Sequence, residues 1–340
     1  MILVTGGTGL IGSHIILDLI REGHQVRALK RPHSDTAFIK QVFEHYLEDP
    51  EVFFNKIEWV NGDILDVLSL DESINGVDYV YHSAALVSFE PGMRKRLRVL
   101  NEKGTANVVN ACLNHSVKKL CYISSIAALG RPEEGQDHID ETLKWKASKY
   151  NTNYAISKYA GEREVWRGIA EGLNAIIVNP SIVLGISNPY KGSTRIFRSA
   201  WKGLRFYPPG INGFVDVEDV SKASIGLMKS DIKNERFILN GFNITYRELF
   251  TKIAIELDKK PPSVETSRWM LEAAWMFEAV KSLITGKKPL LTKETARTSG
   301  NRFIYSNSKV REAIGYEFKD FDKTVAELGR YYGGLFSKGK

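Results

Sequence analysis

The chain opens with Met1-Ile-Leu-Val-Thr-Gly-Gly-Thr-Gly-Leu-Ile-Gly12, an apolar run that meets a glycine-rich turn. The following segment carries apolar residues at helical spacing as far as Ile20. Glycine is needed where a chain turns sharply, where backbone approaches a pyrophosphate and where a helix packs closely on a strand. Gly6, Gly9 and Gly12 can meet these needs, although the spacing is GxxGxxG rather than GxGxxG. The stretch predicts a strand, turn and helix that bind a dinucleotide, with a turn that binds nothing as the alternative.

Beyond this unit, short apolar runs alternate with segments of helical period. Strands in such a pattern are expected to be parallel, buried on both faces and joined by right-handed crossovers. The sequence therefore predicts an α/β protein with a doubly wound parallel sheet, a Rossmann fold. The expected strands are Ile2–Thr5, Gln25–Leu29, Ile57–Val60, Tyr79–His82, Lys119–Ser124, Ala175–Asn179 and Arg236–Leu239.

The length of 340 residues is more than one compact core usually supports, so we expect a second, smaller lobe. After Asn179 the pattern loosens into stretches rich in glycine, proline and asparagine. We expect an NAD(P)-binding Rossmann domain in residues 1–180, rejoined by residues 214–240. Residues 181–213 and 241–340 are then the C-terminal substrate-binding lobe.

Composition and charge point to a soluble, cytoplasmic protein. Hydrophobic residues make up 43% and charged residues 26%, and no apolar run reaches the roughly 18 residues that a membrane span needs. The first residue already belongs to an apolar strand, which leaves no room for a signal peptide. Cys112 and Cys121 have no CxxC spacing, so we expect reduced cysteines and no metal site. The net charge of +7 is spread along the chain, so we expect no nucleic-acid partner and no membrane association.

The end of the second expected strand bears on the choice of cofactor. An acidic side chain there would accept a hydrogen bond from a ribose 2′-hydroxyl and repel a 2′-phosphate. The sequence instead has Lys30 and Arg31, two cations that could bind a phosphate. NADP is therefore favoured. If both are ordinary surface residues, NAD remains possible.

Tyr154 and Lys158 lie four residues apart in a segment predicted to be helical, so they project from one face. A free tyrosine holds its proton up to a pKa near 10, and an adjacent ammonium lowers that pKa. The pair could therefore transfer a proton near neutral pH. On its own, this spacing is more often structural.

Three motifs together resemble the extended branch of the short-chain dehydrogenase/reductase superfamily: Thr5–Gly12, Tyr154-Ala-Ile-Ser-Lys158 and the strand end Ser124-Ser125. The resemblance covers most of the chain. It implies that a serine hydrogen-bonds the reacting oxygen, the tyrosine transfers the proton, and the lysine holds the ribose and tunes the tyrosine. By this likeness Ser125, Tyr154 and Lys158 are the catalytic residues. Ser125 is preferred over Ser124 because it stands five residues before Gly130.

The resemblance also implies which residues bind the cofactor. Asp63 is expected against the adenine, and Asn101 is expected at the head of a helix, where it could instead be a simple N-cap. The full expected set is Gly6, Gly9, Leu10, Ile11, Gly12, Lys30, Arg31, Asp63, Ile64, Ala84, Ala85, Asn101, Ser124, Lys158, Pro180 and Ile182.

The closest pattern is that of dihydroflavonol reductase and 3β-hydroxysteroid dehydrogenase relatives, which implies a small-molecule carbonyl or alcohol substrate. Dehydratases of this superfamily carry Asp and Glu after the reactive hydroxyl, whereas Ser125 is followed by Ile126, Ala127 and Ala128. A nucleotide-sugar epimerase with tightly bound NAD and a non-catalytic dinucleotide-binding protein are the alternatives. Family likeness also suggests a homodimer.

Two apolar features are expected in the second lobe. Aromatic residues there could line an apolar substrate pocket, or could simply be core: Tyr190, Phe197, Phe206, Tyr207 and Phe214. The segment Trp269–Ile284 is the most apolar helical stretch of the lobe. We expect it to be a core or lid helix first, a subunit contact second and a membrane-surface helix third.

Overall fold

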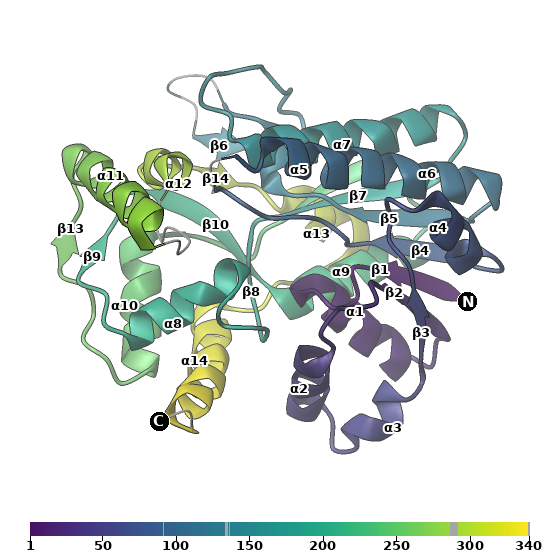
Figure 1. Ribbon diagram of the computed structural model, residues 1–340, viewed down its shortest axis with the longest axis horizontal. Coiled ribbons are helices and arrows are strands. Elements are labelled where there is room, and N and C mark those ends of the chain that lie inside the picture. Colours follow the sequence, from purple (N-terminus) through teal and green to yellow (C-terminus); the bar gives the residue numbers. More distant parts are fainter. Residues whose placement is uncertain (91, 133–134, 136, 286–291, 339–340) are drawn as a thin grey trace.

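Seven parallel strands form the central sheet of the computed structural model, which describes residues 1–90, 92–132, 135, 137–285 and 292–338 (Figure 1). The strand order is β3-β2-β1-β4-β5-β7-β11, and every neighbouring pair is parallel. The order runs outward from β1 in both directions, so the predicted doubly wound Rossmann sheet is confirmed. The strands are β1 Ile2–Thr5, β2 Val26–Lys30, β3 Ile57–Asn61, β4 Tyr79–His82, β5 Lys119–Ile123, β7 Ala175–Pro180 and β11 Glu235–Leu239.

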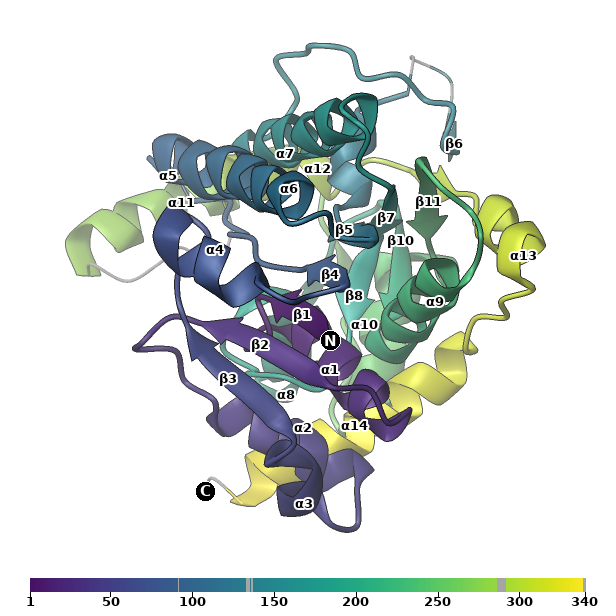
Figure 2. The ribbon, with the colours of Figure 1, turned by 90° about the vertical axis from the view of Figure 1, so that its right-hand side faces the viewer.

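Helices cover both faces of this sheet (Figure 2). Helices α4, α6 and α7 lie on one face, and α1 and α9 lie on the other with α2 and α3 beside them. The helices of these layers are α1 Leu10–Arg21, α2 Ala37–Tyr46, α3 Pro50–Phe54, α4 Val67–Ile74, α5 Arg94–Arg98, the π-helical turn η1 Val99–Lys103, α6 Gly104–Asn114, the 3₁₀ turn η2 Ile126–Leu129, α7 Asn153–Ala170 and α9 Val217–Lys229.

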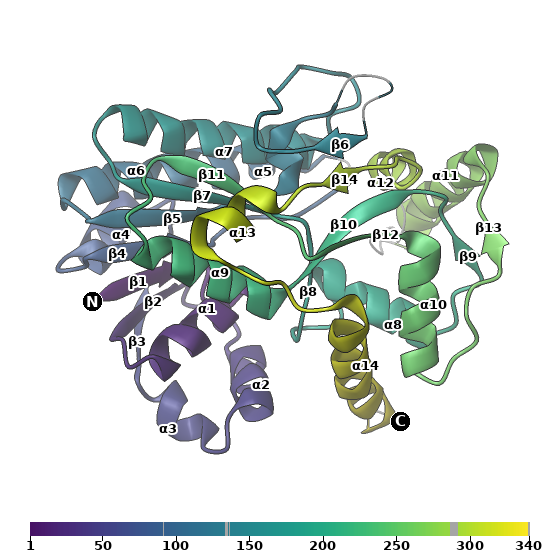
Figure 3. The same ribbon diagram turned by 180° about the vertical axis from the view of Figure 1, so that it is seen from behind.

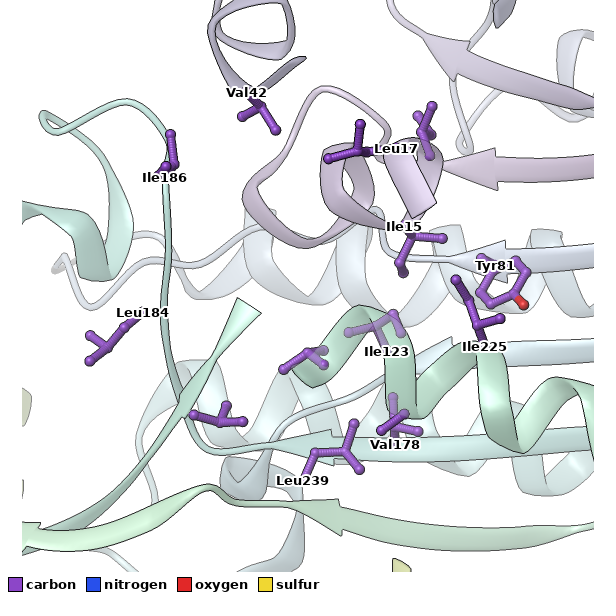
Figure 4. Close-up of a cluster of buried hydrophobic side chains, with 14 of the residues drawn as sticks. Ile15, Leu17, Val42, Tyr81, Ile123, Val178, Leu184, Ile186, Ile225 and Leu239 are labelled. Carbon is purple, nitrogen blue, oxygen red and sulfur yellow. The ribbon is translucent and has the colours of Figure 1, made fainter. Parts of the chain in front are cut away.

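The sheet is buried on both faces because successive side chains of a strand point to opposite sides. In β1, Val4 packs in the core on the α1 and α9 side, and Leu3 packs in the core under α4, α6 and α7. Figure 4 shows the first of these cores, where Ile15 of α1, Ile225 of α9 and Ile123 of β5 come together. Burial on both sides explains why the central strands β1, β5 and β7 are mostly apolar.

The C-terminal part adds smaller sheets and further helices, grouped at one end of the large sheet (Figure 3). Strands β8, β10 and β12 form a three-stranded sheet, and β9 with β13 and β6 with β14 form parallel pairs. The bounds are β6 His138–Ile139, β8 Ile182–Leu184, η3 Gly192–Thr194, α8 Arg195–Trp201, β9 Phe206–Tyr207, β10 Ile211–Asp216, β12 Phe242–Thr245, α10 Tyr246–Glu256, β13 Val264–Glu265, α11 Arg268–Thr285, α12 Lys293–Thr298, β14 Ile304–Tyr305, α13 Ser308–Ile314 and α14 Phe321–Lys338.

The segment expected to rejoin the first domain, residues 214–240, divides between the two sheets. Its first residues belong to β10 of the small sheet, whereas α9 covers the large sheet and β11 extends that sheet beyond β7. The chain therefore passes back and forth between the two parts. The lobe boundaries themselves stay a prediction.

A largely buried ion cluster around Asp216, the Lys319 cluster, joins the C-terminal segment to the junction of β10 and α9. The ammonium of Lys319 lies 3.3 Å from Asp216 Oδ2 and 3.2 Å from Glu218 Oε1, and it also contacts Glu327 of α14. The side chain of Lys319 is only 15% exposed. In addition, its backbone N–H donates to Asp219 Oδ2 at 3.0 Å. Charge pairing therefore fastens the chain that leads into α14.

The apolar residues of the second lobe do not all fit the pocket expectation. Phe197, Tyr207 and Phe214 are buried in the core, and Tyr190 and Phe206 are exposed. The first three are therefore core residues and do not line a substrate pocket.

Helix α11 leaves some of its large apolar side chains exposed. Trp269 is 73% exposed and Phe277 is 69% exposed. The expectation of a core helix is wrong for these side chains, because they have no covering element in the part of the chain that the structure describes. Over that same part, no helix combines the length and apolar character that crossing a membrane requires.

Candidate active site

The glycine turn after β1 is built so tightly that side chains would not fit. Gly6 has φ +69°, and a Cβ there would lie 2.6 Å from the backbone nitrogen of Ala84. A Cβ on Gly12 would lie 2.3 Å from the carbonyl oxygen of Gly6, and the N–H of Gly9 donates to that same oxygen at 2.9 Å. The three glycines therefore bring backbone into close contact at the carboxyl ends of β1 and β4.

The start of α1 offers uncapped backbone donors. Gly9 is the N-cap and supplies no side-chain cap, and the first turn holds no acidic residue. The N–H groups of Leu10, Ile11 and Gly12 are therefore available to an anion, and the helix dipole favours negative charge there. This cradle without side chains fits the pyrophosphate of a dinucleotide. Ala84 and the exposed Ala85 border it after β4.

Lys30 and Arg31 stand at the carboxyl end of β2, where the sequence placed them. Lys30 is half-buried and Arg31 is exposed. Neither side chain has an ion pair or hydrogen bond with any residue that the structure describes. Both cations are therefore free to meet an anionic group.

Asp63 and Ile64 follow β3. The carboxylate of Asp63 accepts a hydrogen bond from the N–H of Leu65 at 3.0 Å. Ile64 is buried and would lie 2.5 Å from a Cβ on Gly104, so it packs close against α6. The Asp63 carboxylate keeps a free oxygen for a further donor.

The candidate catalytic side chains meet at the carboxyl end of β5. Ser125 caps η2, where its Oγ accepts from the N–H of Ala127 at 3.2 Å, and its hydroxyl lies near enough to the Tyr154 phenol to influence the pKa of that group. Lys158 is 1% exposed, and its Nζ donates to the carbonyl oxygen of Ile123 at 2.8 Å. The structure thus brings together the serine, tyrosine and lysine that the sequence singled out.

Burial governs the pKa values at this site. Burial raises the pKa of the Tyr154 phenol, and the nearby hydroxyl of Ser125 works against the rise. Burial lowers the pKa of the Lys158 ammonium to about 7, and the nearby carboxylate of Glu162 works against that fall. Lys158 is therefore poised to change its charge near neutral pH.

Ser124 and Ser125 have different surroundings, as strand alternation requires. The Oγ of Ser124 is buried and donates to Glu162 Oε2 at 2.7 Å. Because this hydroxyl is buried and bound to Glu162, we expect any contact between Ser124 and the cofactor to be through the backbone.

Asn101 is not the N-cap of a helix. It lies inside a continuous helix that begins at Arg94 and passes through the π-helical turn η1 into α6. Its Oδ1 accepts from Leu86 N at 2.7 Å, and its Nδ2 donates at 2.9 Å to both Leu86 O and Ser157 Oγ. Asn101 therefore fastens the segment after β4 to the catalytic helix α7. The N-cap alternative is wrong because the basic run Arg94–Arg98 is helical.

Pro180 and Ile182 lie where β7 gives way to β8. Pro180 ends β7 opposite Leu239 of β11, and Ile182 begins β8 opposite Phe214. Pro180 is thus the last residue of its strand and Ile182 lies just beyond it, at the carboxyl edge where ligands of such sheets bind.

Sequence reasoning missed two acidic residues of this region. Glu294 of α12 accepts hydrogen bonds from the N–H and the side-chain amide of Asn153, at 3.3 and 2.9 Å, directly before Tyr154. It thereby satisfies one of the free N–H groups at the start of α7. The second acidic residue is Glu162. Its position four residues after Lys158 could have indicated that the two side chains share a helix face.

Strand order, glycine cradle and the Ser125–Tyr154–Lys158 arrangement define an NAD(P)-dependent enzyme, a short-chain dehydrogenase/reductase of the extended type. The chain belongs to the NAD dependent epimerase/dehydratase family, which it matches over residues 2–239.

Known relatives and a solved structure agree with this membership. Tetraketide alpha-pyrone reductase 2 of Arabidopsis thaliana is 33% identical over 251 residues, which cover 69% of this chain and 76% of that protein. A 3-beta-hydroxysteroid dehydrogenase of Mycolicibacterium neoaurum is 25% identical, with 98% of this chain and 92% of that protein covered. The crystal structure of gox2253 has a TM-score of 0.79 and 28% identity, and 98% of each chain is covered.

Proposed function

We propose that the protein is an NADP-dependent oxidoreductase that interconverts a carbonyl group and an alcohol, with Tyr154 as its general acid and base. The observation that carries the proposal is the meeting of Ser125, Tyr154 and Lys158 at the carboxyl end of β5. The reductase and dehydrogenase names of the relatives support it. Elimination is disfavoured because no acid follows Ser125 in η2, which reads Ile126-Ala-Ala-Leu129.

The three side chains divide the work of a reduction. The nicotinamide, when bound, supplies the hydride to the carbonyl carbon. Tyr154 gives its hydroxyl proton to the carbonyl oxygen, and Ser125 donates a hydrogen bond to that same oxygen. The Lys158 ammonium stabilises the phenolate that Tyr154 becomes, until solvent returns the proton. Oxidation of an alcohol uses the same groups in reverse.

Aromatic and aliphatic side chains beside Tyr154 support a substrate with apolar bulk. The ring of Phe89 meets the Tyr154 ring edge to face at 5.5 Å between centroids. Val87 and Tyr150, on segments adjoining the same tyrosine, are both more than half exposed. Such surfaces gain free energy when an apolar ligand covers them.

The test is a panel of ketones and aldehydes assayed by NADPH consumption, run beside identification of any nucleotide that co-purifies. Reduction of at least one carbonyl by NADPH is the expected result. NAD that stays bound through purification, with no net reduction of any carbonyl, would instead support a nucleotide-sugar epimerase. No turnover with reversible NADP binding would support a non-catalytic protein.

Arg31→Asp is expected to raise the KM for NADPH by about tenfold or more, because a hydrogen bond to a charged group contributes about 1.5–3 kcal/mol. The introduced carboxylate would also repel a 2′-phosphate. The KM for NADH should change little, since NADH has no such phosphate. Steady-state kinetics with both cofactors measure this.

Arg163→Asp, at another exposed arginine on the outer face of α7, is the matched control and should leave both KM values unchanged. Equal effects of Arg31→Asp on NADPH and NADH would contradict the assignment of NADP.

A further inference from the structure

Glu162 is a buried carboxylate behind the catalytic pair, and the reaction described above makes no use of it. It is 2% exposed and lies on α7 one helical turn after Lys158, so the two side chains share a face. Burying a charge costs free energy unless the charge is paired and hydrogen-bonded. Its donors are Ser124 Oγ at 2.7 Å, Asn179 Nδ2 at 2.9 Å, Arg236 Nη1 at 3.3 Å and Trp166 Nε1 at 3.4 Å.

These hydrogen bonds fix the strand end that carries Ser125. Glu162 Oε2 accepts from both Ser124 and Asn179, and the amide of Asn179 also donates to the carbonyl oxygen of Ser125 at 3.0 Å. Just upstream, Ile123 O accepts from Lys158 at 2.8 Å. Residues 123–125 are thus held from α7 and from β7 at once. A shift of the Glu162 carboxylate would release the backbone on both sides of Ser124.

Within the described part of the chain, the same carboxylate is the acidic group whose charge acts on the Lys158 ammonium. From β5, the ring of Tyr122 lies 4.6 Å below the Lys158 Nζ. From β4, His82 is neutral, because burial and the charge of Lys158 lower its pKa to about 3. Tyr154 lies one helical turn before Lys158 on α7, and burial raises its pKa, so it is uncharged at neutral pH. From β11, Arg236 pairs with Glu162 and offsets part of its charge.

We infer that Glu162 is a positioning residue that does two things for the reaction: it fixes the strand end bearing Ser125, and it keeps the Lys158 amine protonated near neutral pH. The second role follows because burial would otherwise neutralise the Lys158 amine, and Glu162 is the carboxylate that acts on it among the residues that the structure describes. Since the role of Lys158 belongs to the proposed function, the inference rests on that proposal. The inference adds that the charge of Glu162 favours the protonated form of Lys158, and that the charge of Arg236 disfavours it.

The charge balance can be measured without turnover, by NMR titration of the full-length protein labelled with ¹³C at the lysine ε-carbons. The Lys158 signal is assigned as the one that disappears in Lys158→Met. In Glu162→Gln its midpoint should fall by about one pH unit or more, the effect expected of losing an opposite charge nearby. In Arg236→Gln the midpoint should rise, because the cation that competes for Glu162 is gone.

Glu164→Gln is the matched control, on the same helix. Its carboxylate pairs with Arg167 on the outer face of α7 at 2.9 Å, so the Lys158 midpoint should stay where it is in the wild type. An unmoved midpoint in Glu162→Gln would overturn the inference. If that variant fails to fold, Arg236→Gln decides alone: a midpoint that stays or falls overturns the inference.

Once a substrate is known, kinetics give a second readout. With Lys158 less protonated, Tyr154 loses its proton only at higher pH. In Glu162→Gln, the pH at which the rate of alcohol oxidation rises should therefore be higher than in the wild type. A uniform loss of rate at every pH would show a structural role alone and would overturn the charge role. A carbonyl panel without activity would refute the proposed function. The titration needs no substrate, so the Lys158 midpoints would still test the role of Glu162.

Discussion

Tyr154→Phe is expected to lower kcat by about 10²–10⁴-fold, the share of a rate that a positioned acid and base supplies. The substitution removes one hydroxyl. The ring that packs edge to face on Phe89 stays, so the fold and the cradle for the dinucleotide at Gly6, Gly9 and Gly12 should be intact. The measurement pairs kcat with NADPH affinity from a fluorescence titration. We expect lost turnover together with wild-type affinity.

Tyr159→Phe is the control for removing a tyrosine hydroxyl from the same helix. Tyr159 stacks on Trp145 at 4.3 Å between ring centroids, so its ring contact survives the change and turnover should match the wild type. A Tyr154→Phe enzyme that keeps its rate to within about tenfold of the wild type would refute the acid and base role.

Lys319→Met is expected to destabilise the protein by about 3 kcal/mol, the lower end of what removing one partner from a buried ion pair costs. Asp216 is 4% exposed and would be left without its cation at 3.3 Å. The stem of methionine fills similar space, so the effect should come from charge and not from a cavity. Urea unfolding followed by circular dichroism measures the loss.

Lys222→Met is the matched control, because Lys222 also pairs with Glu218, at 3.0 Å, but is 52% exposed. An exposed pair contributes about 0–1 kcal/mol, so this variant should remain close to the wild type. Equal losses in the two variants would contradict a special role for the Lys319 cluster.

The pH dependence of this loss has a definite sign. Burial favours the neutral acid of Glu218, but Lys319 and Lys222 outweigh it and lower the pKa of Glu218 from 4.5 to about 2. The stability that this shift contributes is therefore present above pH 4.5 and disappears as the pH falls from 4.5 toward 2. The gap in unfolding free energy between wild type and Lys319→Met should narrow over that range. A gap that widens on acidification would show that other groups dominate.

The large sheet was predictable because the burial of its strands is visible in their apolar sequences. A strand buried on both faces is mostly apolar, and the runs at Ile2–Thr5 and Tyr79–His82 coincide with β1 and β4 at both ends. The glycine turn was predictable for a similar reason, since a backbone contact that excludes a Cβ leaves one residue type. The apolar runs and the glycine turn can therefore be recognised from short stretches of sequence.

Features that depend on distant partners were not predictable. Phe214 resembles a pocket residue in sequence, and it is core because β12 and Tyr246 cover it. Asn101 was expected at a helix start because the charged run before it has no apolar pattern that would indicate a helix, although it is helical. The surroundings of Glu162 come from Asn179 and Arg236, which are 17 and 74 residues away in the chain. A single sequence shows the acid but not these contacts.

The place of β11 at the edge of the large sheet has a consequence for the protein while it is being made. Strand β7, whose six residues are all buried, receives its outer neighbour only when residues 235–239 have left the ribosome. Until then a growing chain exposes β7 as an unprotected edge, which can pair with other chains. A gene truncated after residue 180 would make this state permanent. Its product should aggregate, whereas one extended through β11 should have this edge covered.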